Sequence, residues 1–166
     1  TFEHTYGGPE ADIGFQVQQT NDGGYALFGA TWNNTAGSAD MLLIRTDAIG
    51  NELWSRTYGG VNLDMGYGGR QTADGGYVLC GMFGGFGTDS LTLIRTDALG
   101  NMTWTGHYPG ALGRDIAYNV VETANGGFTV CGFTEGTGVA EDALLLHVDA
   151  TGGLQWARTI DLAASE

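Results

Sequence analysis

Hydrophobic residues along the chain gather in short runs, which are separated by turns rich in Gly, Asn and Asp. In the first third of the chain four such runs predict strands over 15–20, 25–31, 41–46 and 53–58, which we name a to d. Strands a and b flank Asn21-Asp22-Gly23-Gly24, a sequence typical of a tight hairpin whose central residues need a positive φ. Because no stretch of ten residues shows helical periodicity, the pattern predicts an all-β fold.

This pattern occurs three times. The turn Asp22–Tyr25 returns as Asp74–Tyr77 and as Asn125–Phe128, and three tryptophans follow at spacings of 50 and 52 residues. A four-stranded unit of about 50 residues has the size of one blade of a β-propeller. We therefore interpret the whole chain, 1–166, as a single repeat domain with a leading d strand at 1–8, repeats at 9–58, 59–108 and 109–160, and a tail at 161–166.

The number of strands bears on how the repeats close. Residues 2–8 align with 54–60, so the chain holds three a-b-c sets and four d strands. Known rings contain about four to eight blades, and three alone would leave exposed edges. We expect either two chains that form a six-bladed ring, with the present chain as one half, or a segment of a longer propeller. The alternative is a β-trefoil, whose three four-stranded repeats close by themselves.

Every copy carries Asp-x-x-Gly-x-x-x-Trp between strands c and d. The residues are Asp47, Gly50 and Trp54; Asp97, Gly100 and Trp104; and Asp149, Gly152 and Trp156. This motif resembles the tryptophan-docking motif of quinoprotein-type (PQQ-like) β-propellers, and the wider repeat is similar to one found in secreted prokaryotic proteins. The resemblance implies that Asp and Gly shape the turn and that Trp packs against the neighbouring blade. The third copy departs from the pattern at Pro109, His147 and Gly153.

Composition and charge exclude several kinds of partner. All six basic residues are Arg, there are 19 acidic residues, and the net charge is -13. Binding to a nucleic-acid backbone needs a basic face, so we expect no nucleic-acid partner. The chain has no apolar run of the roughly 20 residues that a membrane helix needs, so we expect no membrane insertion. The low charged content, the absence of Lys and the family resemblance favour an extracellular or cell-surface location.

Several polar residues recur in every copy, which favours a role in the scaffold. Carboxylates in turns can bind calcium, but they also accept hydrogen bonds from backbone N–H groups. Because the sequence has no calcium-loop motif, we favour the hydrogen-bonding role and expect no metal. Arg45, Arg95 and His147 hold one equivalent position in strand c, where we expect each to pair with an acidic neighbour rather than to form a ring for an anion. The other recurring acids are Asp12, Asp64 and Asp115, and Asp40, Asp89 and Asp142.

The sequence gives little support for catalysis. Cys80 and Cys131 stand where the first copy has Phe28, so we expect buried thiols rather than a disulfide. No serine lies in a Gly-x-Ser-x-Gly motif, and we expect no catalytic residue and no cofactor, because three blades lack the complete ring of the quinoproteins. A glycoside hydrolase stays open as an alternative, since carboxylate pairs are set by space rather than by spacing; its candidate acids are Glu10, Glu122, Glu135 and Glu141.

The loops between strands b and c differ most among the copies, and a specific function is expected where copies differ. An extra tryptophan beside asparagines can stack on a sugar ring or anchor a protein, although a loop aromatic can also fold onto its own blade. The candidate ligand-binding residues are Trp32, Asn33, Asn34, Phe83 and Phe86. We thus expect a non-catalytic scaffold or protein-interaction module that associates with itself as a dimer or with further blades; the alternative is a carbohydrate-binding module with a glycan ligand.

Overall fold

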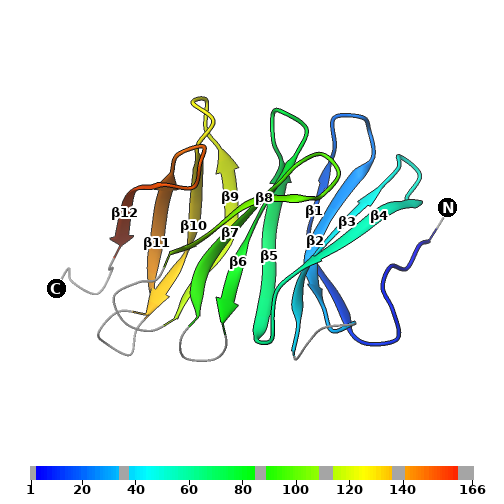
Figure 1. Ribbon diagram of the computed structural model, residues 1–166, viewed down its shortest axis with the longest axis horizontal. Helices are drawn as coiled ribbons and strands as arrows, with labels where there is room; N and C mark the ends of the chain where they lie inside the picture. Colours follow the sequence, from blue (N-terminus) through cyan, green and yellow to red (C-terminus); the bar gives the residue numbers. More distant parts are fainter. Residues whose placement is uncertain (1–2, 34–37, 85–88, 109–113, 136–140, 161–166) are drawn as a thin grey trace.

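A computed structural model describes residues 3–33, 38–84, 89–108, 114–135 and 141–160, and these residues form twelve β-strands (Figure 1). None of the described residues is helical, so no helix in this part of the chain could span a membrane. The strands are β1 (Asp12–Gln19), β2 (Tyr25–Thr31), β3 (Asp40–Thr46), β4 (Glu52–Tyr58), β5 (Leu63–Gln71), β6 (Tyr77–Gly84), β7 (Ser90–Thr96), β8 (Met102–Tyr108), β9 (Asp115–Glu122), β10 (Phe128–Glu135), β11 (Glu141–Val148) and β12 (Leu154–Ile160).

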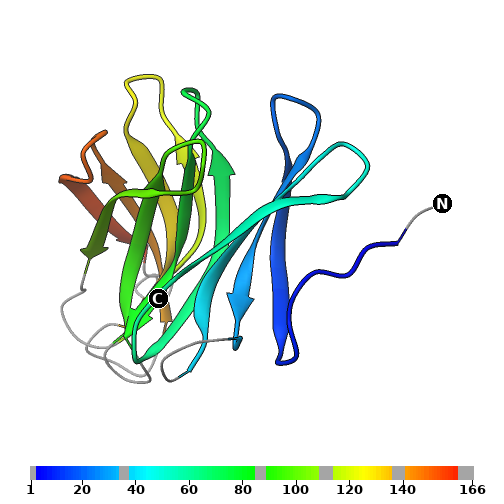
Figure 2. The ribbon, with the colours of Figure 1, turned by 45° about the vertical axis from the view of Figure 1, so that its right-hand side comes forward.

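The strands form three separate antiparallel sheets in chain order, β1-β2-β3-β4, β5-β6-β7-β8 and β9-β10-β11-β12. The predicted all-β fold with three four-stranded units is confirmed. Among the described strands, each pairs only within its own sheet, which is the arrangement of propeller-like blades rather than of a β-trefoil. The sheets follow one another side by side, and the first strands β1, β5 and β9 contact their neighbours along the series (Figures 1 and 2).

The sequence explains the local geometry of each sheet. Gly23, Gly75 and Gly126 adopt φ values of 89°, 89° and 81° in the turns between first and second strands, a conformation that favours glycine. Each first strand also contains a β-bulge, opposite a glycine of the second strand, for example between Gly14 and Gln16. A bulge adds one residue to the strand and re-aims its side chain. β1 begins at Asp12, before the predicted start at 15, because the bulge lets pairing continue past Gly14.

Two hydrophobic cores join the three sheets. Successive side chains of a strand point to opposite faces, so β6 contributes to both cores. Tyr77 and Leu79 face the first sheet, whereas Val78 and Cys80 face the third. Each large apolar side chain buried in this way contributes about 1.5–3 kcal/mol. The first core holds Ala26, Phe28, Met41, Leu43 and Tyr58 with Tyr77, Leu79 and Ile94; the second holds Val78, Cys80, Leu91 and Leu93 with Ala117, Val120, Phe128, Val130, Leu146 and Val148.

Two sheet faces have no neighbouring sheet. We call the side of the first sheet that points away from the second sheet its open face; Val17, Leu27 and Ile44 form one row on it. The open face of the third sheet carries Cys131, in register with Leu145, and β12 is exposed along its whole length. Residues 3–8, which the sequence predicts as a leading d strand, form no strand and run beside the first sheet (Figure 2).

Candidate functional site

The Asp-x-x-Gly motif forms the turn between the third and fourth strands of each sheet. Asp47 Oδ1 accepts hydrogen bonds from the N–H groups of Ile49 (2.9 Å) and Asn51 (2.8 Å), and Gly50 takes φ 86°. Asp97 repeats these contacts with Leu99 and Asn101. The hydrogen bond from the Asn51 side chain lowers the pKa of Asp47, so the carboxylate stays ionised as an acceptor. These aspartates therefore shape turns, as does Asp149 in the third sheet.

In β4 and β8 the tryptophan and a tyrosine contact the turn of the next sheet. A Cβ added at Gly100 would stand 2.8 Å from the Trp54 ring, and the hydroxyl of Tyr58 donates to the Gly100 carbonyl at 2.7 Å. The second and third sheets repeat this arrangement with Trp104, Tyr108 and Gly152, again with a 2.7 Å hydrogen bond. Burial raises the pKa of Tyr108 to about 12, so its hydroxyl keeps the proton that it donates.

We call this Trp/Tyr-to-Gly contact the junction. The role of its tyrosine was missed in the sequence, although a signal was there: a tyrosine stands four residues after the tryptophan in the first two copies. The third copy has Ile160 at that position, which cannot donate a hydrogen bond.

The leading segment makes the tyrosine half of a junction with the first sheet. Tyr6 donates its hydroxyl to the Gly50 carbonyl at 2.6 Å, as Tyr58 does to Gly100. The following residues are also equivalent, because Asp12 accepts from the Gly8 N–H at 2.9 Å as Asp64 does from the Gly60 N–H at 2.7 Å. Residues 3–8 thus hold the place of an outer strand without pairing as one.

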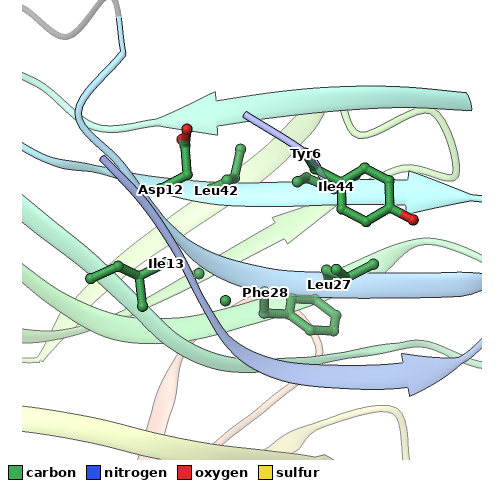
Figure 3. Close-up of a pocket in the computed structure, with 9 residues that line it drawn as sticks. Tyr6, Asp12, Ile13, Leu27, Phe28, Leu42 and Ile44 are labelled. Carbon is green, nitrogen blue, oxygen red and sulfur yellow. The ribbon is translucent and has the colours of Figure 1, made fainter. Parts of the chain in front are cut away.

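A hollow of about 80 Å³ lies between this segment and the open face of the first sheet (Figure 3). Apolar side chains dominate its lining, and Asp12 lies at its edge. The residues that line the hollow are Tyr6, Asp12, Ile13, Gly14, Leu27, Phe28, Gly29, Leu42 and Ile44.

Two arginines pair with acids of their own sheets, which confirms the predicted local pairing. Arg45 Nη2 contacts Asp22, and its Nε donates to the Tyr77 hydroxyl of the next sheet at 3.0 Å. Arg95 Nη2 lies 2.6 Å from Asp74. In the third sheet His147 and an asparagine replace this pair, and His147 Nδ1 lies 3.0 Å from the Thr129 hydroxyl. The predicted acidic partner is therefore present for the two arginines, but the prediction is wrong for His147, which contacts a hydroxyl instead.

The carboxylates Asp40 and Asp64 lie close together between the first and second sheets. A Cβ at Gly59 would stand 2.1 Å from Asp40 Oδ1 and 2.7 Å from Asp64 Oδ2. Burial, with the charge of Asp64, raises the pKa of Asp40, and burial raises that of Asp64. Asp40 Oδ1 is buried and accepts no hydrogen bond within the described residues. Across those residues no three His, Cys, Asp or Glu side chains gather as a metal site.

The predicted ligand-binding residues have partners within the fold. Trp32 is half-buried, and Asn33 donates to Asp12 Oδ2 at 2.7 Å while accepting from the Glu10 N–H at 2.8 Å. Phe83 packs on the His107 ring with centroids 4.7 Å apart. Asn34 and Phe86 lie outside the described residues. Asn33 thus ties the end of β2 to the start of β1, and Phe83 packs within its own sheet.

A row of aromatic rings crosses the three first strands at their bulges. The centroids of Phe15 and Tyr67 are 5.1 Å apart, and those of Tyr67 and Tyr118 are 5.4 Å apart. Phe15 and Tyr118, at the two ends, are 43% and 49% exposed. The strand alternation does not predict this row, because the bulges that aim the three side chains alike leave no signal in the sequence pattern.

The two cysteines differ in exposure. Cys80 is fully buried between the second and third sheets, and burial raises the pKa of its thiol. The prediction that Cys131 is buried is wrong, because Cys131 holds the equivalent place on the open face of the third sheet and nothing in the described chain covers it.

Comparisons of the sequence with models of protein families and with curated proteins give no match.

Proposed function

We propose that this chain is a non-catalytic β-propeller scaffold, an interaction module of a secreted or cell-surface protein, built from blades of the quinoprotein type. The observation that carries the proposal is the junction, which occurs in the same form between the first and second sheets and between the second and third. Trp54 and Trp104 each cover a turn glycine, and Tyr58 and Tyr108 each donate to its carbonyl.

The polar residues that recur among the copies support the same role. Asp47, Asp97 and Asp149 are held by the backbone of their turns, and Arg45 and Arg95 are held by acids of their own sheets. A scaffold built from such units gains stability with each unit and each contact between units, as other repeat proteins do.

The test is to insert a second copy of residues 59–108 directly after residue 108. The added blade brings one more junction, so the four-blade chain should fold with more β-structure by circular dichroism and unfold at a higher urea concentration. The matched control is the same insertion with Trp104→Ala in the inserted copy, which should lose most of the gain. A four-blade chain that aggregates, or that unfolds at the wild-type urea concentration, would contradict the proposal.

The aromatic row favours glycan binding as a second candidate function. Exposed aromatic rings are common platforms for apolar sugar faces, and Phe15 and Tyr118 both present exposed ring surface. A glycan array should then show binding that Phe15→Ala and Tyr118→Ala weaken and that Trp32→Ala leaves intact. Binding that only Trp32→Ala removes would place the glycan at the loops, and no binding at all would end this candidate.

A further inference from the structure

The two internal junctions define what a docked sheet looks like. The second sheet presents Cys80, Leu93 and Trp104 to the third sheet, and Cys80 becomes fully buried as a result. The first sheet presents Phe28, Leu43 and Trp54 to the second at the equivalent positions. In both cases the receiving sheet offers apolar side chains of its second and third strands and the glycine of its last turn.

The open face of the third sheet carries the presenting half of this arrangement without a receiver. Cys131 and Leu145 lie opposite each other on β10 and β11, and Trp156 lies opposite His147 on β12 and β11. Trp156 is 38% exposed and stacks on His147 with centroids 5.5 Å apart, whereas Trp54 and Trp104 are half-buried beneath the next turn. Cys131 is therefore exposed here, whereas the equivalent Cys80 is buried at the second junction.

The open face of the first sheet carries the receiving half. Leu27 and Ile44 are equivalent to Leu79 and Ile94, which lie under the first sheet at the first internal junction. Gly50 is equivalent to Gly100 and adopts the same positive φ. The hollow of about 80 Å³ beside Leu27 and Ile44 shows that the leading segment does not fill this face as a whole sheet would.

The leading segment already occupies the place of the incoming fourth strand. Tyr6 donates to the Gly50 carbonyl, which is the acceptor that a docked strand would use. β12 carries Ile160 at the position of the tyrosine, so that position offers no hydroxyl to compete for this acceptor.

We propose that the open face of the third sheet docks on the open face of the first sheet of a second copy of this chain, and that residues 3–8 hold this docking site closed by taking the place of the incoming strand. The proposal rests on the scaffold function, since it reuses the junction between copies. Two such contacts would close six sheets into one ring, within the range of known propellers. The net charge of -13 on each copy opposes the association, and salt should therefore strengthen it.

The experiment compares wild type with Tyr6→Ser by light scattering after size exclusion, over concentrations up to about 0.5 mM and at low and high salt. Wild type should remain near 17.4 kDa where Tyr6→Ser moves toward twice that mass, with self-association strengthened at least about threefold. Adding Cys131→Arg to Tyr6→Ser should restore the monomer, whereas adding Leu99→Arg, at an exposed turn residue outside both open faces, should not.

The native thiols report where the contact forms and whether the fold persists. In the associated Tyr6→Ser variant Cys131 should react slowly with Ellman's reagent, while Cys80 stays unreactive in every folded sample. If Tyr6→Ser makes Cys80 reactive, Tyr6→Phe, which removes only the hydroxyl, replaces it and must shift the mass in the same direction by a smaller amount.

Two results would overturn the proposal. One is a folded Tyr6 variant that stays monomeric with Cys131 fully reactive; the other is a wild type that already associates with Cys131 protected. Neither result would touch the scaffold function, which the inserted repeat tests on a single chain.

Discussion

The junction makes a quantitative prediction for alanine at the turn glycines. Gly75 and Gly100 adopt φ values of 89° and 79°, so alanine at either position costs about 1–2 kcal/mol of backbone strain. Alanine also restricts the unfolded chain, which returns about 0.4–1 kcal/mol, so Gly75→Ala should lower the free energy of unfolding by about 1 kcal/mol. A Cβ at Gly75 meets nothing within 4 Å, which makes this variant the measure of strain alone.

Gly100→Ala adds a steric term to the same strain. Its Cβ would stand 2.8 Å from the Trp54 ring and 2.8 Å from the Arg56 Cγ, and overpacking of this kind costs about 1–3 kcal/mol. The total loss is then about 2–4 kcal/mol. Gly152→Ala should fall between the two variants, because its Cβ would stand 3.1 Å from the Trp104 ring.

Urea unfolding followed by circular dichroism and by tryptophan fluorescence measures the series. The free energies of unfolding should fall in the order Gly75→Ala, Gly152→Ala, Gly100→Ala, and each kcal/mol should lower Tm by about 2–4 °C in a chain of this size. Equal losses for Gly75→Ala and Gly100→Ala would refute the view that the turn glycine is required by the neighbouring tryptophan.

Three further experiments test the junction, the carboxylate of Asp40 and the arginine pairs. Tyr58→Phe should lower the free energy of unfolding by about 1–2 kcal/mol, because a buried carbonyl loses its donor. Tyr6→Phe should cost less than about 0.5 kcal/mol, because its hydrogen bond is only partly buried. Equal losses of the two variants in urea unfolding would contradict this reasoning. Asp40→Asn should stabilise the protein at about pH 7 and not at about pH 3. The raised pKa of Asp40 favours folding fully below the unfolded value of 3.8, and this contribution is lost as the pH rises through the folded pKa. A variant less stable than wild type at about pH 7 would refute this. Arg45→Lys should lower Tm more than Arg95→Lys, because Arg45 also donates to a tyrosine of the next sheet, and the reverse order would show that this bond contributes nothing.

The strands and their turns could be predicted because they depend on local chemistry. Asn-Asp-Gly-Gly permits a narrow set of turns, and the tryptophan spacing shows the repeat directly. Residues 3–8 of the predicted leading d strand form no strand. A d strand forms by pairing with the third strand of a sheet, and none of the described strands pairs with this segment. Tyr6 shows that the alignment still identified a real equivalence, at the level of a side-chain contact.

Features that depend on neighbouring sheets could not be predicted in this way. Cys80 and Cys131 have the same sequence context, and their exposure differs only because one sheet is followed by another and the other is not. The ligand residues proposed in the loops were chosen for their chemistry, but Asn33 is engaged by Asp12 and by backbone that follows the leading segment. Sequence variation among copies cannot distinguish a residue that binds a partner from one whose hydrogen bonds hold the end of a strand in place.

The junction has a donor side, which carries the tryptophan and tyrosine, and an acceptor side, which offers a backbone carbonyl. This difference gives the series of sheets a polarity. Two donor sides, or two acceptor sides, cannot form a junction with each other. Contacts between copies that reuse the junction are therefore heterologous, and such contacts close into a ring only when the rotation per sheet is right; otherwise they extend into a filament. A substitution that changes the angle between two sheets, without removing any contact, would then change the shape of the assembly rather than its strength.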